Sequence, residues 1–285
     1  MTAAAAAVPP VSGGSSRNAA FTCRVLAGRG SEVERARGPF PERVLLIGNS
    51  HWHWAALGDG ALASWHQPPP LAPHLEQGWP ELAAWAAVGT VPQGLGLPPE
   101  RQLRIERVPL RRAPAWLGID RALAGWWAWR CQRGGGVLVA DAGTALSLTR
   151  VDAEGCFAGG RISAGLGLQL RALGSGTALL PHLEAGAQLN PLPPWPEATA
   201  EAMASGCLRA CGAAIAGAWA ELVQEGSGRQ GSSPELQRWQ LWLTGGDAEA
   251  LAPELERLGI PFRWAPDLGL EALAELAGLR PERGP

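Results

Sequence analysis

The sequence contains no lysine and no tyrosine, so each of its 24 Lys+Arg residues is an arginine. A phosphate-binding loop of the Walker type depends on a lysine that reaches the nucleotide phosphates. That route to nucleotide binding is therefore excluded. The formal net charge is −2, which gives no indication of binding to nucleic acid or to an anionic membrane surface.

Cysteine is scarce, and the spacing of the cysteines does not suggest pairs. The chain has five cysteines and no Cys-x-x-Cys motif, which argues against a disulfide framework or a zinc ribbon and favours a reducing, cytoplasmic setting. Cys207 and Cys211 are one helical turn apart, and we interpret them as small apolar helix residues rather than metal ligands. We find no apolar run long enough to span a membrane and no signal-peptide pattern at the start.

The length of 285 residues allows one large domain or two modest ones. Residues 1–40 are rich in Ala, Gly, Ser, Pro and Arg without periodicity, and we predict a disordered leader there. We place an N-terminal domain at 41–138, a C-terminal domain at 139–278 and a tail at 279–285.

A strand, a sharp turn and a second strand are predicted over residues 137–148. An apolar run leads to Asp141, which puts a carboxylate at the end of the first strand. Gly143 lets the backbone approach a ligand closely, and Thr144 offers a hydroxyl at the tip. Such a turn can hold phosphate through backbone N–H groups while the carboxylate holds a cation.

Two further glycine turns follow apolar strands. Residues 44–47 predict a strand that leads into Gly48-Asn49-Ser50, and the alternation in 51–57 predicts a second strand. Residues 241–243 predict a strand that leads into a turn at 244–247 and a helix through 258. In an open α/β sheet, ligands sit beyond the carboxyl ends of strands. The three turns together indicate a nucleotide held between two related halves.

His51 and His53 would share one face of the strand at 51–57. They are either metal ligands or structural or substrate-facing side chains. With no third ligand nearby in the sequence, the second interpretation is favoured.

Asp120 and Arg121 lie near the start of a helix predicted over 122–130, where an anion is favoured. An alternative is a capping Asp followed by a solvated Arg.

The remaining elements are read from periodicity and from Pro and Gly positions. We predict a helix at 80–87, a strand at 87–91 and a possible strand at 102–108. Loops are predicted at 64–73, 191–196 and 226–233, and a hairpin turn at 151–157. Gly159 and Gly160 would cradle a ligand before a helix at 166–173, or mark a close crossing of backbones. Helices are predicted at 197–224 and at the C-terminal end.

Six short segments, in this order, resemble the type III pantothenate kinases, a family of the actin-like superfamily of acetate and sugar kinases and heat-shock ATPases. They cover residues 44–273. The segments are Gly48-Asn49-Ser50; Pro114-x-x-Leu117-Gly118-x-Asp120-Arg121; Asp141-x-Gly143-Thr144-Ala145; Gly159-Gly160-x-Ile162; Thr199-x-x-Ala202-x-x-x-Gly206; and Thr244-Gly245-Gly246-Asp247.

The resemblance implies an α/β fold of two actin-like (ribonuclease H-like) domains, each a mixed sheet flanked by helices, with the nucleotide in the cleft between them. It implies that ATP phosphorylates pantothenate in the first step towards coenzyme A. Mg²⁺ and a monovalent cation, K⁺ or NH₄⁺, would be cofactors. The enzyme would be a cytoplasmic homodimer without nucleic-acid or membrane partners.

The resemblance also implies residue roles. Asp120 would be the base that accepts the proton of the substrate hydroxyl, and Asp141 would hold the monovalent cation. The pantothenate site would comprise Gly118, Ile119, Asp120, Arg121 and Thr199, with Thr199 from the other subunit. The ATP site would comprise Leu46, Ile47, Gly48, Asn49, Ser50, His51, Trp52, His53 and Thr144.

The sequence departs from the family pattern at three positions. Leu46 stands where the first motif usually has Asp, so a carboxylate near the phosphates is missing. His53 stands where Lys or Arg is common, and Ala164 where Pro is common. Two alternatives to the kinase follow: a weakened family member with a regulatory or accessory role, and another actin-like small-molecule phosphotransferase.

Overall fold

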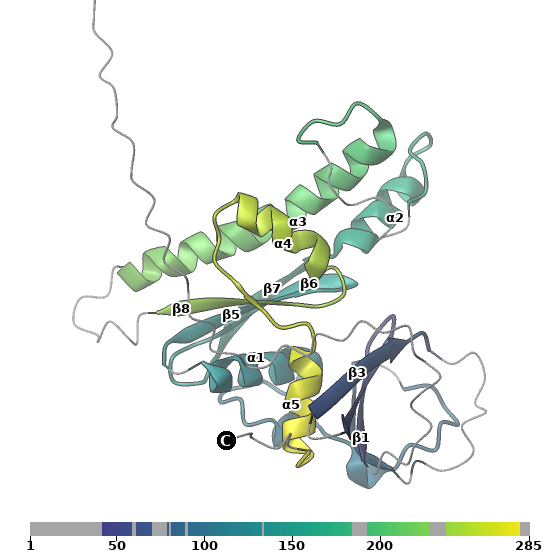
Figure 1. Ribbon diagram of the computed structural model, residues 1–285, viewed down its shortest axis with the longest axis vertical. Helices are drawn as coiled ribbons and strands as arrows, with labels where there is room; N and C mark the ends of the chain where they lie inside the picture. Colours follow the sequence, from purple (N-terminus) through teal and green to yellow (C-terminus); the bar gives the residue numbers. More distant parts are fainter. Residues whose placement is uncertain are drawn as a thin grey trace, which may run out of the picture.

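The computed structural model describes residues 42–58, 61–69, 79, 81–88, 91–132, 134–183, 193–227 and 238–279. The predicted leader at 1–40, nearly all of the predicted tail and most of the predicted loop at 226–233 lie outside these residues. The described chain forms two lobes, each built on one sheet (Figure 1).

The first lobe contains a four-stranded sheet in the order β3-β2-β1-β4. Strand β1 is antiparallel to β2 and parallel to β4. An isolated parallel bridge joins Trp85 of β4 to Gln102, at the position of a fifth strand. The elements are β1 (Arg43–Ile47), β2 (Trp52–Gly58), β3 (Ala61–Gln67), β4 (Leu82–Ala87) and the short 3₁₀ turns η1 (Pro99–Arg101) and η2 (Ile105–Arg107).

The second lobe repeats this plan in the order β7-β6-β5-β8-β9. Its first strand, β5, is likewise antiparallel to the next strand, β6, and parallel to β8. The two lobes are therefore related halves, as the pattern of glycine turns predicted. The strands are β5 (Gly136–Ala142), β6 (Ala145–Val151), β7 (Phe157–Ala164), β8 (Trp239–Thr244) and β9 (Arg263–Trp264).

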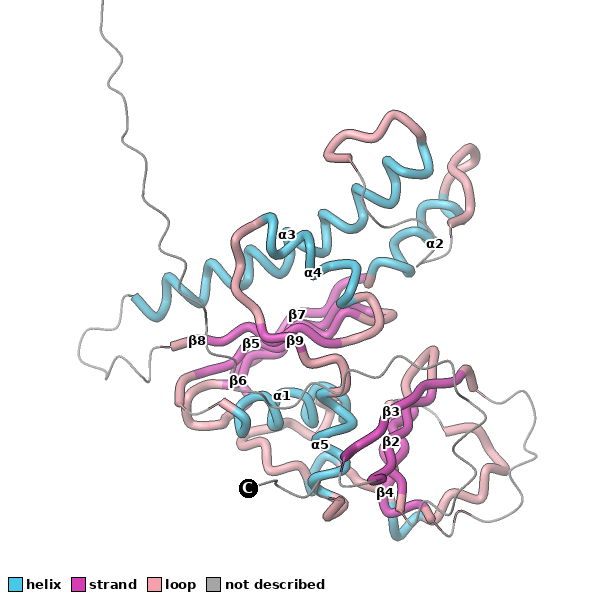
Figure 2. Tube along the Cα trace, viewed as in Figure 1, coloured by secondary structure: helices cyan, strands magenta, loops and turns pink. Residues whose placement is uncertain are grey.

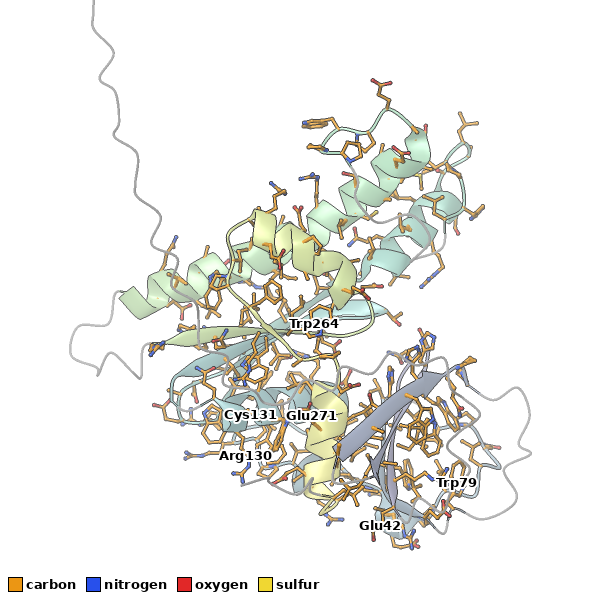
Figure 3. The ribbon with its side chains drawn as sticks, viewed as in Figure 1. Glu42, Trp79, Arg130, Cys131, Trp264 and Glu271 are labelled. Atoms are coloured by element: carbon orange, nitrogen blue, oxygen red, sulfur yellow. The ribbon has the colours of Figure 1, made fainter. Side chains whose placement is uncertain are left out.

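Helices cover the second sheet on both faces (Figure 2). On one face lie α2 (Leu166–Gly176), α3 (Thr199–Ser227) and α4 (Ala248–Arg257). On the other lie α1 (Ile119–Cys131) and α5 (Leu268–Leu276), which also pack against the first sheet. One apolar cluster joins α1 and α5 to both sheets. Trp127 Nε1 of α1 donates to Glu271 Oε2 of α5 at 2.9 Å, and Figure 3 labels Glu271 on that helix.

Strand β1 is buried on both faces because successive side chains alternate between them. Val44 and Leu46 pack towards α1 and α5, whereas Leu45 and Ile47 join a cluster on the outer face. Tryptophans cover that outer face in place of a helix. Trp54 stacks on Trp65 and on Trp79, with ring centroids 6.0 and 5.8 Å apart, and Figure 3 labels Trp79.

Helix α3 corrects one expectation from the sequence. Its residues Thr199–Glu225 are long and apolar enough to cross a membrane by length and composition alone. In the structure α3 packs on the second sheet, with Met203, Cys207, Cys211 and Ile215 in the apolar cluster. The two cysteines are buried helix residues, as predicted. Core packing therefore accounts for the apolar residues on this face of α3.

Several predicted elements were wrong. Residues 82–87, predicted as helix, form β4. Of the strand predicted at 87–91, Ala87 is the last residue of β4, whereas Val88 and Val91 are not in a strand. Residues 61–67 form β3, although 64–73 was predicted as loop. The segment at 102–108 has one bridge and a 3₁₀ turn. Gly159 and Gly160 lie inside β7, where a Cβ at Gly160 would lie 2.3 Å from the Leu148 oxygen, so the alternative of a close crossing of backbones is confirmed there. Where a strand formed against expectation, pairing with a neighbouring strand overrode local propensity. Where a predicted strand did not form, it had no such partner along its length.

Candidate active site

The first turn follows β1 and is closed by glycine. The Gly48 N–H donates to the His51 carbonyl oxygen at 3.0 Å. A Cβ at Gly48 would lie only 2.9 Å from the same oxygen, so a larger residue would force the turn open. The next two residues, Asn49 and Ser50, are exposed and carry polar side chains. This turn therefore presents two polar side chains on its exposed side.

The second turn joins β5 to β6 and is supported by the start of α2. The Gly143 N–H donates to the Ala145 oxygen at 3.2 Å, and the Gly165 N–H donates to the Thr144 oxygen at 3.1 Å. A Cβ at Gly165 would lie 2.0 Å from the Gly143 oxygen, so only glycine allows this approach. Thr144 stays exposed at the tip.

The third turn supports the second. Gly245 has φ +95°, and a Cβ there would lie 2.5 Å from Asp141 Oδ1. The Asp247 N–H donates to the Ala142 oxygen at 2.8 Å. The Asp247 carboxylate accepts hydrogen bonds from the backbone N–H groups of Leu166 and Gly167, which satisfies donors at the start of α2. The third turn thus contacts both Asp141 and the start of α2.

The first two turns meet across the lobes. Ser50 Oγ and Thr144 Oγ1 are 2.7 Å apart, within hydrogen-bond distance, although 94 positions separate them in the chain. The prediction that two strand–turn–strand units face one another is therefore confirmed.

Asp141 is the carboxylate at the end of β5. Burial of its carboxyl, and then the nearby charge of Asp120, raise the pKa of Asp141 to about 7. A carboxylate that is desolvated and repelled by a second one favours a bound cation, because a cation would offset both the repulsion and the loss of hydration.

Asp120 lies in the first turn of α1. Burial raises the pKa of its carboxyl, while the Arg121 N–H, which donates to Asp120 Oδ1 at 2.8 Å, and the Arg121 charge oppose the rise. A Cβ at Gly118 would lie 2.6 Å from Asp120 Oδ1. Glycine at 118 therefore leaves the carboxylate room at the helix start, and the raised pKa makes it a better proton acceptor.

Arg121 is buried, so the alternative of a solvated arginine is wrong. Its Nε donates to Thr149 Oγ1 at 3.0 Å, and its guanidinium lies 5.9 Å from the centre of the Phe157 ring. A Cβ at Gly160 would lie 2.3 Å from Arg121 Nη2 and 2.3 Å from the Leu148 oxygen. Gly160 therefore makes room for the guanidinium, and Thr149 fixes its direction.

Comparison with known proteins gives the family. A family model described as type III pantothenate kinase matches residues 100–221. The type III pantothenate kinase of Synechococcus elongatus is 39% identical over 250 residues, which is 82% of this chain and 95% of that protein. The enzyme of that name from Thermosynechococcus vestitus is 37% identical over 229 residues, 79% of this chain and 84% of that protein.

This chain belongs to the type III pantothenate kinase family. The predicted actin-like α/β fold is confirmed, because the family and the repeated strand order agree. Among solved structures, the ROK hexokinase of Thermus thermophilus has 15% identity and a TM-score of 0.36, with coverage of 82% of this chain and 97% of that one.

The structure places the predicted kinase residues in three groups. The turn residues Gly48, Asn49, Ser50 and Thr144 meet at the junction of the lobes, and Asp120 acts on Asp141 electrostatically. The side chains of Leu46, Ile47, Trp52 and Ile119 are buried in apolar clusters and are turned away from a ligand.

Thr199 does not lie with the other predicted site residues. It is exposed at the start of α3, on the face of the second sheet opposite α1. Figure 1 shows that this end of α3 is remote from α1. Thr199 and Asp120 of one chain therefore do not share a site.

From the sequence, no site role was assigned to three residues that surround the site. His66 joins His51 and His53, Thr149 orients Arg121, and Asp247 holds the start of α2. Hairpin register could have found His66, because Asp59-Gly60 is a strong two-residue turn signal. Within the described ranges, no group of three or more His, Cys, Asp or Glu side chains is arranged to hold a metal ion.

Proposed function

We propose that this chain transfers the γ-phosphoryl group of ATP to the hydroxyl of pantothenate, giving 4′-phosphopantothenate in the first step of coenzyme A synthesis. The observation that carries the proposal is the meeting of Ser50 and Thr144 beside the Asp120–Asp141 pair, in a chain of this family. Phosphoryl transfer needs in-line positioning and neutralised charge more than covalent help.

Asp120 is the proposed proton acceptor. Its carboxyl has a raised pKa through burial, and a hydrogen bond from the Arg121 N–H holds one of its oxygens. A carboxylate in this setting can orient the pantothenate hydroxyl and take its proton as the new bond to phosphorus forms.

Arg121 is the proposed anchor for pantothenate, with Gly118 and Ile119 as the neighbouring wall. One guanidinium nitrogen is engaged with Thr149, and the fork of remaining donors suits the substrate carboxylate. Because the group is buried, a ligand carboxylate would bind it in a low dielectric and gain correspondingly.

The triphosphate of ATP is assigned to the two meeting turns. The exposed residues Asn49 and Ser50 of the first turn lie there, and the Ser50 and Thr144 hydroxyls are 2.7 Å apart. The side chains of His51 and His53 flank the first turn. With no lysine in the chain, backbone amides, hydroxyls and cations must balance the phosphate charge.

Asp141 is the proposed ligand for the monovalent cation, and the residues fit one. Its carboxyl is desolvated and repelled by Asp120, so a cation beside it relieves both costs. Mg²⁺ would supply charge neutralisation on the phosphates of ATP. Leu46 cannot contribute, since its side chain packs into the core, where Gly269 of α5 approaches it closely.

A homodimer is proposed from the position of Thr199. Because α1 and α3 cover opposite faces of the second sheet, Thr199 can reach a pantothenate site only in another copy. We also propose a cytoplasmic enzyme without nucleic-acid or membrane partners. In the described part of the chain, Cys156, Cys207 and Cys211 are free thiols, which fits a reducing compartment.

An ADP-release assay with ATP, Mg²⁺ and pantothenate, with and without potassium, tests the proposal. We expect pantothenate-dependent ADP release that rises with potassium. The apolar Leu46 favours one competing function, a regulatory family member that binds ATP without turnover. ATP binding without ADP release would support that function, and release with a different hydroxyl substrate in a panel would indicate another phosphotransferase.

A further inference from the structure

Three histidines gather beside the first turn. His53 of β2 is paired with His66 of β3, and His51 immediately precedes β2. The ring centroids of His51 and His66 are 5.6 Å apart, those of His53 and His66 are 6.3 Å apart, and those of His51 and His53 are 6.4 Å apart. We call these three residues the histidine cluster.

Two rings of the histidine cluster lie on the α5 side of the first sheet, and one of them lies against the first turn. Leu46, His53 and His66 form one cross-strand row, and Leu46 points towards α5, so the two imidazoles share that face of the sheet. A Cβ at Gly48 would lie 3.5 Å from His53 Nε2, which places this ring against the first turn. His51 closes the turn through its carbonyl oxygen.

Among the residues that the structure describes, no hydrogen bond or ion pair joins the cluster to a carboxylate. Burial first, and then the charges of His66 and His51, lower the pKa of His53 to about 4, so this ring is neutral near pH 7. Apolar Leu46 faces it from β1. Asp267, at the start of α5, accepts a hydrogen bond from Ser64, two residues before His66. A nearby anion would favour the protonated form of His53, so the cluster is suited to receive one.

We propose that the histidine cluster binds the polyphosphate of ATP and takes up a proton as the nucleotide binds. The proton comes from solvent and is held on an imidazole of the cluster, with no bond made or broken to phosphorus. The cluster then carries a positive charge only while the nucleotide is bound, whereas a lysine would carry one permanently. This inference rests on the proposed function and names His66 as a further ATP-site residue.

Calorimetry of a non-hydrolysable ATP analogue with saturating Mg²⁺ tests the inference. Binding enthalpies measured at pH 7 in buffers of different ionisation enthalpy give the number of protons taken up. We expect about half to one proton in the wild type, since a nearby polyanion raises an imidazole pKa. His66→Gln and His53→Gln should each weaken binding about tenfold and lower the uptake. The matched control is His182→Gln, an exposed histidine beside α2, which should match the wild type.

Wild-type affinity and proton uptake in both cluster variants would overturn the inference. Weaker binding with unchanged uptake would overturn it as well, because the rings would then act without protonation. Turnover of pantothenate is measured separately. If pantothenate is phosphorylated but the cluster variants bind normally, the inference fails and the proposed function stands. If the uptake depends on the cluster but pantothenate is not phosphorylated, the proposed function fails instead.

Discussion

Ser50 Oγ and Thr144 Oγ1 lie 2.7 Å apart and connect the glycine turns of the two lobes. Each hydroxyl stands at the tip of a turn that glycine keeps tight, at Gly48 and Gly165. The contact shows that the two halves of the chain meet where their first strands end. It also places both hydroxyls where the phosphates of ATP are proposed to bind.

Removing the Thr144 hydroxyl should weaken ATP binding with little effect on the fold. Thr144→Val keeps the shape of the side chain and removes one hydrogen-bonding group, worth about 0.5–1.5 kcal/mol. We therefore expect the KM for ATP to rise about threefold to tenfold. Thr177→Val is the control, since its exposed hydroxyl bonds only the Leu173 oxygen at the end of α2. Equal KM values in the two variants would argue against phosphate binding at Thr144.

Asp120→Asn should separate catalysis from nucleotide binding. Loss of a general base lowers turnover by about 10²- to 10⁴-fold, whereas the affinity for ATP should stay within about twofold because no ATP contact is assigned to Asp120. Steady-state kinetics measure the turnover, and nucleotide titration measures the affinity for ATP. The control is Glu106→Gln, an exposed carboxylate on η2. A variant at 120 that keeps near-wild-type turnover would refute the role of base.

Potassium dependence should shift with pH through Asp141. Its pKa of about 7 means that protons compete with the cation below neutrality. The potassium concentration for half-maximal activity should therefore fall about tenfold from pH 6 to pH 8. Asp141→Asn should lose this dependence together with most of the activity. A half-saturating concentration that is constant across this range would contradict the assignment.

The same carboxyl predicts a pH effect on stability. Its folded pKa of about 7 exceeds the unfolded value of about 3.9, so the folded state binds the extra proton between them. Without potassium, the wild type should lose stability relative to Asp141→Asn as pH rises from 5 to 8. Thermal unfolding measures the difference, and potassium should reduce it at pH 8. A gap between the two proteins that does not change with pH would count against a desolvated carboxyl.

Gly160→Ala should damage the pantothenate site through Arg121. The new methyl group would meet Arg121 Nη2 and the Leu148 oxygen, and neither the buried guanidinium nor the strand can yield easily. We expect a lower melting temperature and a KM for pantothenate raised about tenfold or more, since a buried charged group loses its fixed position. Gly217→Ala is the matched control, because an exposed glycine inside α3 with open space should gain about 0.5–1 kcal/mol. Unchanged pantothenate kinetics in Gly160→Ala would show that Arg121 needs no such space.

The glycine turns could be predicted because their chemistry is local. An apolar run followed by Gly48 or Gly143 specifies a strand end and a tight turn wherever the rest of the chain lies. The contact between Ser50 and Thr144 was only implied, since it depends on how the two lobes pack.

The wrong elements share a physical cause. Strand β4 reads LAAWAA, with no β-branched residue, and alanine favours a helix when nothing else decides. Its parallel pairing with β1 and its burial decide otherwise. The polar residues of β3 favoured a loop prediction, although β3 is a strand whose register pairs His66 with His53. Non-local pairing of this kind is not readable from periodicity alone.

The roles of Arg121 and Gly160 also required the structure. The sequence left open whether Arg121 was solvated, because a charge near a helix start is usually exposed. Its burial depends on Thr149 and Phe157 from the β6–β7 hairpin, which follows the helix in the chain. The family segment could point to the residue, but only the packing explains how it is held.

The most direct test of the central claim is detection of the product by phosphorus NMR. The wild-type protein is incubated with ATP, Mg²⁺, potassium and pantothenate, and the spectrum is followed over time. The account predicts a growing phosphomonoester signal that coincides with authentic 4′-phosphopantothenate and is absent when pantothenate is omitted. ATP that remains intact, or is hydrolysed to inorganic phosphate alone, would contradict it.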